Sequence, residues 1–321
     1  MRAAQLVAPR QWELVEVDKP QIAAGQMLVR MERVAVCGSD QPPFSGVHEG
    51  YPQAPGATGH EGCGIVEACP SGQYQEGERV LLWGFDRGLF QEYVLAHDAG
   101  GCIRLPGDLP EETALMSQLL GTVIHSFYKL GNIIDHDVAV IGQGPVGLLF
   151  CAVLRNLGAR RIIAIDRHAY RLETSRKMGA THAVNATDAD PVAAVAEITG
   201  GAMADLVVEA VGLPESINLV PAVARRNAQV ICFGVPDKAQ HQGLVEVNML
   251  NMLRQELKVH FSVGPNPDRD YRPALDWIVQ GRIDVTPVVS HILPFEQIQQ
   301  AFTMAFDEPE PHRALKIVLK F

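Results

Sequence analysis

Hydrophobic and polar positions follow two different patterns along the chain. Up to about residue 105, short apolar runs alternate with Gly, Pro and polar residues at irregular spacing; the clearest runs are residues 27–38, 62–70, 78–84 and 90–96. Short runs between turn residues are typical of strands in a small barrel or sandwich. Pro106 and Pro110 then mark a change of character. Residues 111–131 predict a helix, because acidic residues open it and Gly131 stops it.

From residue 137 onward, strands and helices alternate. The predicted strands are residues 137–142, 161–166, 182–186, 205–212 and 228–234, and the helices between them include residues 145–158 and 169–179. Continuous Val, Ile and Leu runs separated by helices indicate a parallel sheet that is covered on both faces. Helices at 273–280 and 294–306 and a closing strand at 314–321 complete the pattern. The fold class is therefore α/β.

Composition and charge argue against several classes of function. The 321 residues favour about two domains, and 47% hydrophobic with 20% charged residues is ordinary for a folded protein. The net charge of −10 argues against a general nucleic-acid binder or an anionic-membrane protein. No apolar run approaches the roughly 18 residues of a membrane span. Charges throughout residues 1–20 exclude a signal peptide there.

The cysteines predict a reducing environment. Six cysteines are scattered along the chain, at positions 37, 63, 69, 102, 151 and 232. They are too few for a disulfide scaffold in a chain of this length. The expected compartment is the cytoplasm.

The strongest local motif is a glycine-rich turn between a predicted strand and a helix. Gly142, Gly144 and Gly147 form G-x-G-x-x-G, with Pro145 and Val146 inside the motif. The first glycine permits the tight turn, the second lets the backbone approach a pyrophosphate, and the third allows close helix–strand packing. The helix N-terminus supplies N–H groups to the phosphates. The motif predicts a dinucleotide site.

An acidic residue at the end of the next strand predicts which dinucleotide binds. Asp166 lies 19 residues after Gly147. A carboxylate at this position accepts a hydrogen bond from the ribose 2′-hydroxyl and repels a 2′-phosphate. It therefore favours NAD over NADP, although Arg167 and Arg171 follow it and weaken the discrimination.

Three residues in the first part of the chain have the chemistry of zinc ligands. Cys37 follows an apolar run, and His60 and Glu61 stand at the start of another. Thiolate, imidazole and carboxylate all suit the first coordination shell of Zn²⁺. Taken singly, a cysteine at such a position is more often a packing residue, and a His-Glu pair is more often part of the polar surface.

The combination of motifs is more specific. CGSD, GHEGCGIVE, GERV and the glycine motif, in this order, resemble the medium-chain dehydrogenase/reductase family, in its zinc-dependent alcohol and polyol dehydrogenase branch. The resemblance covers essentially the whole chain. It implies a GroES-like, partly open β-barrel catalytic domain at 1–120 and 265–321. A Rossmann NAD-binding domain, a doubly wound parallel sheet, would occupy 121–264.

The resemblance also implies roles for individual residues. Cys37, His60 and Glu61 match the ligands of one catalytic zinc, and Ser39 matches the hydroxyl that hydrogen-bonds the alcohol and receives its proton. In the family the metal acts as a Lewis acid, and hydride passes from the alcohol to nicotinamide. Further positions match residues that border the cofactor: Thr122, Val211, Phe233, Gly234 and Val235.

Three departures from the family pattern leave alternatives open. Gln118, or else Ser117, stands where relatives often place a third zinc ligand, and a neutral amide is a poor one. Pro42 replaces a histidine that ends a proton relay, so the proton leaves through Ser39, cofactor hydroxyls or water, or through another group such as His48. Between Trp83 and Leu105 there is only Cys102, which predicts no structural zinc.

The leading hypothesis is a zinc- and NAD-dependent enzyme that interconverts a secondary alcohol or polyol and the matching ketone. A zinc-free NAD(P)H-dependent reductase of carbonyls or quinones, motivated by Gln118 and Pro42, is the alternative within the family. A protein that only senses or binds the nucleotide is a third. Partners are expected to be a small alcohol or carbonyl substrate and further copies of the chain, as a homodimer or homotetramer that contacts through residues 241–253.

Overall fold

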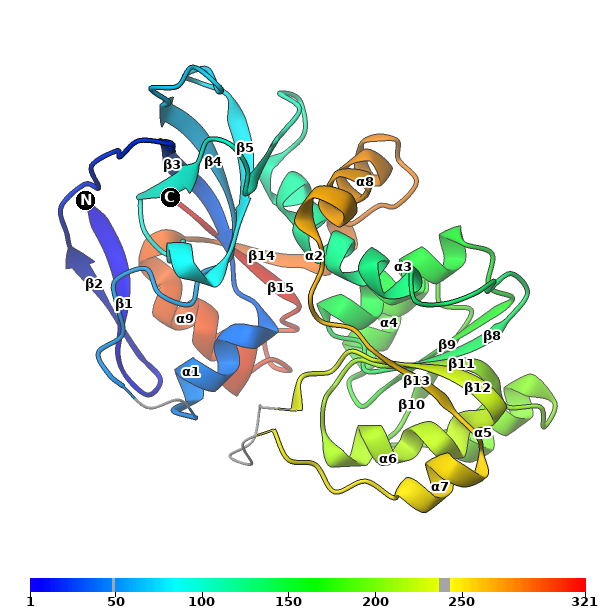
Figure 1. Cartoon of the computed structure of the whole chain (residues 1–321). Coiled ribbons are helices and arrows are strands. Elements are labelled where there is room, and N and C mark those ends of the chain that lie inside the picture. Colours follow the sequence, from blue (N-terminus) through cyan, green and yellow to red (C-terminus); the bar gives the residue numbers. More distant parts are fainter. Residues whose placement is uncertain (48–49, 237–242) are drawn as a thin grey trace. The chain divides into compact units, whose positions relative to one another are not determined.

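A computed structural model describes residues 1–47, 50–236 and 243–321, which form two compact units (Figure 1). The first unit comprises Met1–Gln118 and Val289–Phe321, and the second comprises Leu119–Val288. The predicted first domain resumed at residue 265, so the second boundary lies later than expected. The reason is that α8 (Pro267–Val279) packs within the second unit. There Asp270 accepts a hydrogen bond from His125 Nδ1 at 2.8 Å.

The first unit is built on a mainly antiparallel sheet. Among the described residues its strand order is β14-β15-β3-β4-β5-β7, with β6 also paired to β3. The strands are β3 (Gln26–Ala35), β4 (Glu61–Ala68), β5 (Arg79–Trp83), β6 (Tyr93–His97), β7 (Cys102–Arg104), β14 (Val289–Pro294) and β15 (Lys316–Lys320). A separate hairpin joins β1 (Arg2–Ala8) to β2 (Gln11–Glu16). The β-rich first part of the chain that the sequence predicts is thus confirmed.

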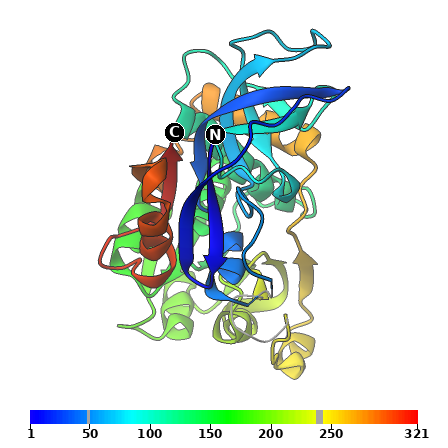
Figure 2. The same ribbon diagram turned by 90° about the vertical axis from the view of Figure 1, so that its left-hand side faces the viewer.

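The C-terminal strand completes this sheet beside one of the first strands. β15 runs antiparallel to β3, with Val318 opposite Ala35, and parallel to β14. Figure 2 shows the red C-terminal strand and the blue N-terminal strands within the same unit. This pairing brings Lys316, at the start of β15, near the end of β3.

Aromatic side chains fill the core of the first unit. Phe302, the last residue of α9 (Ile298–Phe302), is fully buried, and its ring centroid lies 5.1 Å from that of Phe44 and 4.8 Å from that of Trp12. The predicted helix at 294–306 is interrupted. A 3-10 turn precedes α9 and a π-helical turn at Thr303–Asp307 follows it.

The second unit contains the predicted parallel sheet. Its strand order among the described residues is β10-β9-β8-β11-β12-β13, and every pairing is parallel. The strands are β8 (Asp137–Ile141), β9 (Arg161–Asp166), β10 (His182–Asn185), β11 (Ala204–Glu209), β12 (Ala224–Cys232) and β13 (Lys258–Phe261). The carboxyl ends of β8, β11 and β12 are neighbours.

Helices cover both faces of this sheet, as the continuous apolar strands require. α3 (Pro145–Asn156) and α4 (Ala169–Lys177) lie on one face, and α5 (Pro191–Thr199) and α6 (Pro214–Val223) lie on the other (Figure 1). The short helix α7 (Met249–Arg254) precedes the edge strand β13. α2 (Glu111–Phe127) begins in the first unit and ends in the second.

One predicted helix begins earlier than expected. The apolar pattern predicted a start at residue 273, whereas α8 starts at Pro267. The Asn266 side chain accepts the N–H of Arg269 at 3.2 Å, which caps the helix, and proline is favourable in the first turn. None of the helices in the described ranges has the length and apolar composition that a bilayer crossing requires.

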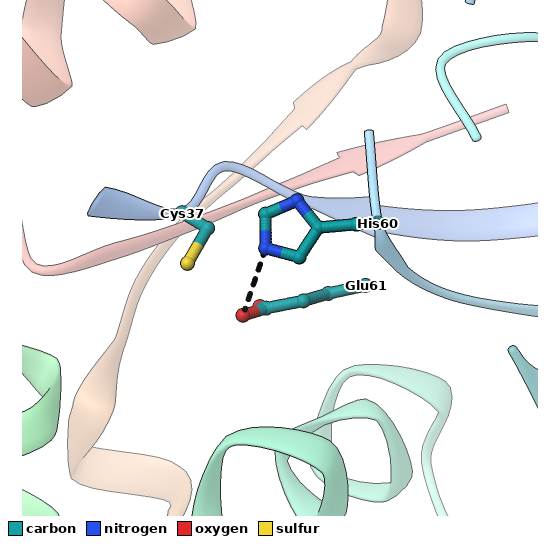
Figure 3. A group of neighbouring side chains, drawn as sticks. All are labelled: Cys37, His60 and Glu61. Atoms are coloured by element: carbon teal, nitrogen blue, oxygen red, sulfur yellow. Dashed lines mark ion pairs between the residues drawn. The ribbon is translucent and has the colours of Figure 1, made fainter. Parts of the chain in front are cut away.

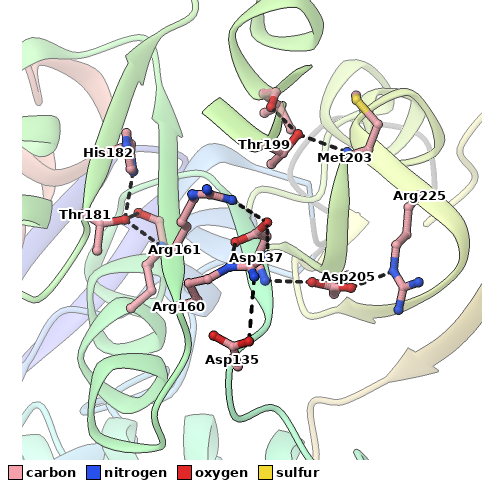
Figure 4. A network of polar contacts seen from close by, with 12 residues as sticks. Asp135, Asp137, Arg160, Arg161, Thr181, His182, Thr199, Met203, Asp205 and Arg225 are labelled. Carbon is pink, nitrogen blue, oxygen red and sulfur yellow. Dashed lines mark hydrogen bonds and ion pairs between the residues drawn. The ribbon is translucent and has the colours of Figure 1, made fainter. Parts of the chain in front are cut away.

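An ionic network lies at the amino end of the parallel sheet (Figure 4). Asp137, the first residue of β8, is buried, and its carboxylate accepts hydrogen bonds from Arg160 at 2.9 and 2.7 Å and from Arg161 at 2.8 Å. Asp205 accepts the N–H of Asp137 and pairs with Arg225. This network lies at the end of the sheet opposite the glycine motif.

Candidate active site

Cys37 is held by the turn that follows β3. The N–H of Val36 donates to Ile317 O of the C-terminal strand at 3.0 Å, which fixes where β3 ends. Cys37 precedes a 3-10 turn at Gly38–Asp40, and its own N–H donates to Asp40 Oδ2 at 2.8 Å. The Asp40 side chain is fully buried. This acid therefore sets the turn that presents the sulfur.

His60 and Glu61 are placed by the tight entry into β4. A Cβ atom at Gly59 would lie 2.7 Å from the main-chain nitrogen of Phe90, so only glycine fits there, and one at Gly62 would lie 2.5 Å from the Met31 side chain, which would have to move. His60 Nδ1 donates to the carbonyl of Thr58 at 2.8 Å. With Nδ1 bonded to this carbonyl, Nε2 is the ring nitrogen that would bind a metal.

The three predicted ligands converge (Figure 3). One donor atom from each of Cys37, His60 and Glu61 lies within 4.8 Å of the other two, and we call these three residues the metal group. His60 and Glu61 are buried and Cys37 is half-buried. One sulfur, one imidazole nitrogen and one carboxylate oxygen in such a group form a donor set that fits zinc.

A buried lysine lies next to this group. Lys316 is 1% exposed, and its Nζ forms an ion pair with Glu61 Oε2. Burial raises the pKa of Glu61, but Lys316 and His60 lower it more, so it falls below its usual value. Burial lowers the pKa of Lys316, but Glu61 and Cys37 raise it above its usual value. Both groups therefore remain charged near neutral pH.

Neighbouring groups also change the pKa of His60. Burial lowers the pKa of His60, whereas the Cys37 sulfur and the Asp40 carboxylate raise it, and the outcome is well above the usual value. His60 Nδ1 lies 3.5 Å from Asp40 Oδ1, and its Nε2 lies 3.8 Å from Glu61 Oε1. Anionic groups on several sides make this a site that attracts a cation.

Ser39, Pro42 and Gln118 are further positions that the sequence associated with the proton or with the third metal ligand. Ser39 Oγ lies 3.1 Å from His60 Nε2, so the predicted hydroxyl is at the metal group. Pro42 is buried in the short helix α1 (Gln41–Ser45). Gln118 is buried on α2. His48, the other proton carrier considered, lies outside the described residues.

The glycine motif has the conformation that its sequence predicts. Gly142 has φ +90°, which favours glycine, and a Cβ at Gly147 would lie 1.8 Å from Gly142 O. A Cβ at Gly144 would meet nothing within 4 Å, so the backbone there is open to a ligand. α3 starts at Pro145, followed by Val146, with its first N–H groups beside this turn.

Asp166 lies at the end of β9, directly beside the glycine turn. Its Oδ2 accepts the N–H of Gln143 at 2.6 Å, and its Oδ1 accepts the N–H of His168 at 2.9 Å. Arg171 Nη1 lies 3.9 Å from Oδ2, while Arg167 is exposed. The carboxylate therefore has a second role that the sequence did not suggest, because it also fixes the glycine turn.

Two loops reach the carboxyl end of the sheet next to the glycine motif. Val211 follows β11, and Phe233, Gly234 and Val235 follow β12. The side chain of Val211 stands so close to Gly142 that a Cβ there would lie 2.4 Å from it. Thr122 is half-buried on α2 in the same unit. The two loops and the glycine motif thus meet at one edge of the sheet, where ligands of open parallel sheets bind.

Sequence reasoning missed three buried charged residues in these regions. Asp40, Lys316 and Glu209 are each at most 1% exposed. Asp40 stands inside the CGSD motif but received no role, and Lys316 is distant in sequence from the group it contacts. Glu209 ends an apolar strand, and an acid within that apolar run is the one signal the sequence offered.

Comparisons with known proteins agree with this arrangement. Residues 23–107 match the family described as "Alcohol dehydrogenase GroES-like domain", and residues 145–280 match "Zinc-binding dehydrogenase". The chain is 28% identical to L-threonine 3-dehydrogenase of Bacillus velezensis, over 91% of each chain. It is 29% identical to an alcohol dehydrogenase of Cupriavidus necator, over 100% of this chain and 98% of the relative.

Solved structures show the same fold. The alcohol dehydrogenase TADH from Thermus sp. ATN1 superposes with a TM-score of 0.85 at 27% identity and covers 100% of this chain and 99% of its own. The galactitol-1-phosphate dehydrogenase of Escherichia coli has a TM-score of 0.83 at 21% identity, with 100% of both chains covered. The protein is an oxidoreductase, and it belongs to the medium-chain dehydrogenase/reductase family, in the zinc-dependent alcohol and polyol dehydrogenase branch.

Proposed function

We propose that this chain is a zinc- and NAD-dependent dehydrogenase that interconverts a secondary alcohol or polyol and the matching ketone. The convergence of Cys37, His60 and Glu61 within 4.8 Å carries the proposal. These three residues would hold one catalytic zinc. When bound, zinc supplies a Lewis acid that lowers the pKa of the substrate hydroxyl, and the nicotinamide ring accepts the hydride.

The chain's own residues prepare the site for this reaction. Thr58 O fixes the tautomer of His60, Asp40 fixes the Cys37 turn, and Lys316 keeps the Glu61 carboxylate charged. Ser39 Oγ lies next to His60 and is the hydroxyl that would take the alcohol proton. With proline at position 42, that proton would pass from Ser39 to water or to cofactor hydroxyls.

The dinucleotide would bind at the carboxyl end of the parallel sheet. The pyrophosphate would lie over Gly144 and the first turn of α3, and the adenosine ribose would lie beside Asp166. Thr122, Val211 and the loop at 233–235 would border the nicotinamide half. NAD rather than NADP is proposed because the buried Asp166 carboxylate would repel a 2′-phosphate.

A metal assay combined with two variants tests the catalytic part of the proposal. Protein purified without chelator should contain about one zinc per chain by elemental analysis. Cys37→Ala and His60→Ala should lose the zinc and nearly all turnover, whereas Cys69→Ala, a half-buried cysteine outside the metal group, should keep both. Full turnover by the two metal-free variants would instead indicate a zinc-free reductase. NADH binding without any turnover would indicate a nucleotide-binding protein.

The substrate class can be assigned with a defined panel. Relatives and structural neighbours bear the names L-threonine 3-dehydrogenase, 2R,3R-butanediol dehydrogenase and L-idonate 5-dehydrogenase. L-threonine, butanediols and sugar acids or polyols are therefore the substrates to test first, with primary alcohols as the contrast. Higher kcat/KM for a secondary alcohol than for its primary isomer is the expected result.

Self-association is also proposed, as a homodimer or homotetramer. β13 is an edge strand with a partner on one side only among the described residues. Exposed apolar side chains lie on β13 and α7 or near them in the sequence; we call this set the edge surface, and it comprises Leu244, Met249, Leu250, Leu253, Phe261 and Val263. Exposed apolar patches beside an unpaired edge favour association. Residues 241 and 242 of the predicted contact segment lie outside the described residues.

The compartment proposed is the cytoplasm. All six cysteines are free in the structure. Free thiols fit a reducing environment.

A further inference from the structure

Glu209 holds the loop that follows β11. It is the last residue of that strand and is fully buried. Its Oε1 accepts the N–H groups of Val211 and Gly212, each at 2.8 Å, and the hydroxyl of Ser216 at 2.7 Å. One carboxylate oxygen therefore fixes residues 210–212 and the first turn of α6.

The main chain of the same residue holds the neighbouring loop. The carbonyl oxygen of Glu209 accepts the N–H of Phe233 at 2.9 Å and that of Gly234 at 3.0 Å. Residues 233–235, which follow β12, are thus tied to the same point as residues 210–212. The main-chain bonds persist whatever the side chain, so a substitution of Glu209 acts on residues 210–212 directly and on residues 233–235 through their packing against that loop.

The two loops and the glycine motif are closely packed against one another. A Cβ at Gly212 would lie 2.4 Å from Val235 O, and a Cβ at Gly234 would lie 2.1 Å from Gly212 N. Val211 in turn contacts the first glycine of the motif, Gly142. These contacts leave no free space between the segments. A displacement of the 210–212 loop would therefore also displace the 233–235 loop and the glycine turn, against which a ligand would bind.

The buried Glu209 side chain carries a cost in folding free energy. Its second oxygen, Oε2, is buried and has no hydrogen-bond partner among residues 1–47, 50–236 and 243–321. Burial of an incompletely paired carboxylate is unfavourable. A residue with this cost at the ligand edge of a parallel sheet points to a role in binding rather than in stability.

We propose that Glu209 is a positioning residue for the dinucleotide: it sets the affinity for the cofactor by fixing the loops at 210–212 and 233–235. This inference rests on the proposed function. Glu209 does not need to touch the cofactor, because its hydrogen bonds decide where the main chain of both loops lies. The effect is expected on cofactor affinity and KM, while kcat at saturating cofactor changes less.

Titration of NADH, followed by its fluorescence, tests the proposal on the full chain. Glu209→Ala removes the acceptor of three hydrogen bonds and should raise the Kd about tenfold or more. Glu209→Gln keeps an oxygen at the same reach and should stay within about threefold of the wild type. If the alanine variant does not fold, Glu209→Asp replaces it, because its carboxylate is drawn back by one methylene and should also weaken binding.

A matched control separates positioning from stability. Asp137 is a buried carboxylate with three hydrogen bonds at the opposite end of the same sheet. Asp137→Asn should lower the unfolding temperature but leave the Kd for NADH unchanged. Wild-type affinity in Glu209→Ala, or an equal loss of affinity in both variants, would overturn the inference. Failure of the wild type to bind either NADH or NADPH would instead refute the proposed function.

Discussion

Lys316 and Glu61 form a buried ion pair although they are far apart in the sequence. The lysine begins the C-terminal strand β15, and the glutamate begins β4 within the metal group. Two charges removed from water are stable only when each compensates the other. The return of the C-terminus to the first unit therefore supplies the countercharge of one proposed zinc ligand.

Replacement of this lysine tests the relationship. Lys316→Met leaves the Glu61 carboxylate buried without its partner, and we expect the zinc-free protein to lose about 3 to 5 kcal/mol of unfolding free energy. Zinc should restore part of the loss, because the ion would then compensate Glu61. Lys320→Met, on the exposed end of the same strand, is the control. Chemical unfolding with and without zinc measures both, and a variant as stable as the wild type would contradict the prediction.

The free cysteines predict a labelling pattern. Burial raises the pKa of Cys63 and of Cys151 to about 12, so both thiols stay protonated and unreactive. Slight burial raises the pKa of Cys69, but the Ser71 hydroxyl, 3.3 Å from its sulfur, lowers it below its usual value. Iodoacetamide at pH 8 should modify Cys69 first and leave Cys63 and Cys151 intact until the chain unfolds.

Zinc adds a second part to that experiment. Bound metal should protect Cys37 from alkylation and leave the rate at Cys69 unchanged, since only the first is a proposed ligand. Peptide mass spectrometry gives both rates in one sample. Equal rates at Cys37 with and without zinc would exclude its coordination.

Much of the fold could be predicted because local signals were strong. The glycine motif, Asp166 and the apolar strands from residue 137 define the parallel sheet, since each depends on neighbours in sequence. Asp40, Glu209 and Lys316 escaped prediction because their partners are set by tertiary contacts. The sequence ALKIVLKF suggests that Lys316 is an exposed lysine. Only the pairing of β15 with β3 explains why it is buried. The boundary at residue 265 shifted for the same reason, because α8 packs on α2.

Cofactor choice should depend on the charge of Asp166. Asp166→Asn keeps an oxygen for the Gln143 N–H but removes the repulsion of a 2′-phosphate, and Arg167 and Arg171 then favour that phosphate. Like charges in contact cost several kcal/mol, so the NADP-to-NAD ratio of kcat/KM should rise by roughly tenfold or more. Steady-state kinetics with both cofactors measure the ratio, and no change would remove Asp166 from the specificity site.

The edge surface should control the oligomeric state. Glutamate in place of Leu253 and Phe261, which are 70% and 76% exposed, adds like charges where two copies would meet. The double variant should sediment as a smaller species than the wild type while it keeps its secondary structure. Val279→Glu, at an exposed apolar position on α8, should leave the assembly intact. A wild type that sediments as a monomer at micromolar concentration would disprove association.

The network at the amino end of the sheet predicts a stability difference that depends on pH. Burial raises the pKa of Asp137, but Arg160 and Arg161 lower it below its usual value of 3.8. The folded carboxylate therefore binds protons less readily than the unfolded one. Its stabilisation is complete above the usual pKa and is lost as the pH falls through the lower, folded value.

Asp137→Asn removes the charge and keeps the size of the side chain. It should lower the unfolding free energy at pH 7 by about 1 to 3 kcal/mol, the range for hydrogen bonds to charged groups. As the pH falls from about 4 through the lower, folded pKa, the wild type progressively loses the same contribution, so the gap between the two proteins should narrow. Asp135→Asn, whose carboxylate is 74% exposed, should match the wild type throughout. Urea unfolding from pH 3 to 7 tests this, because a constant gap would show that packing rather than charge stabilises this end of the sheet.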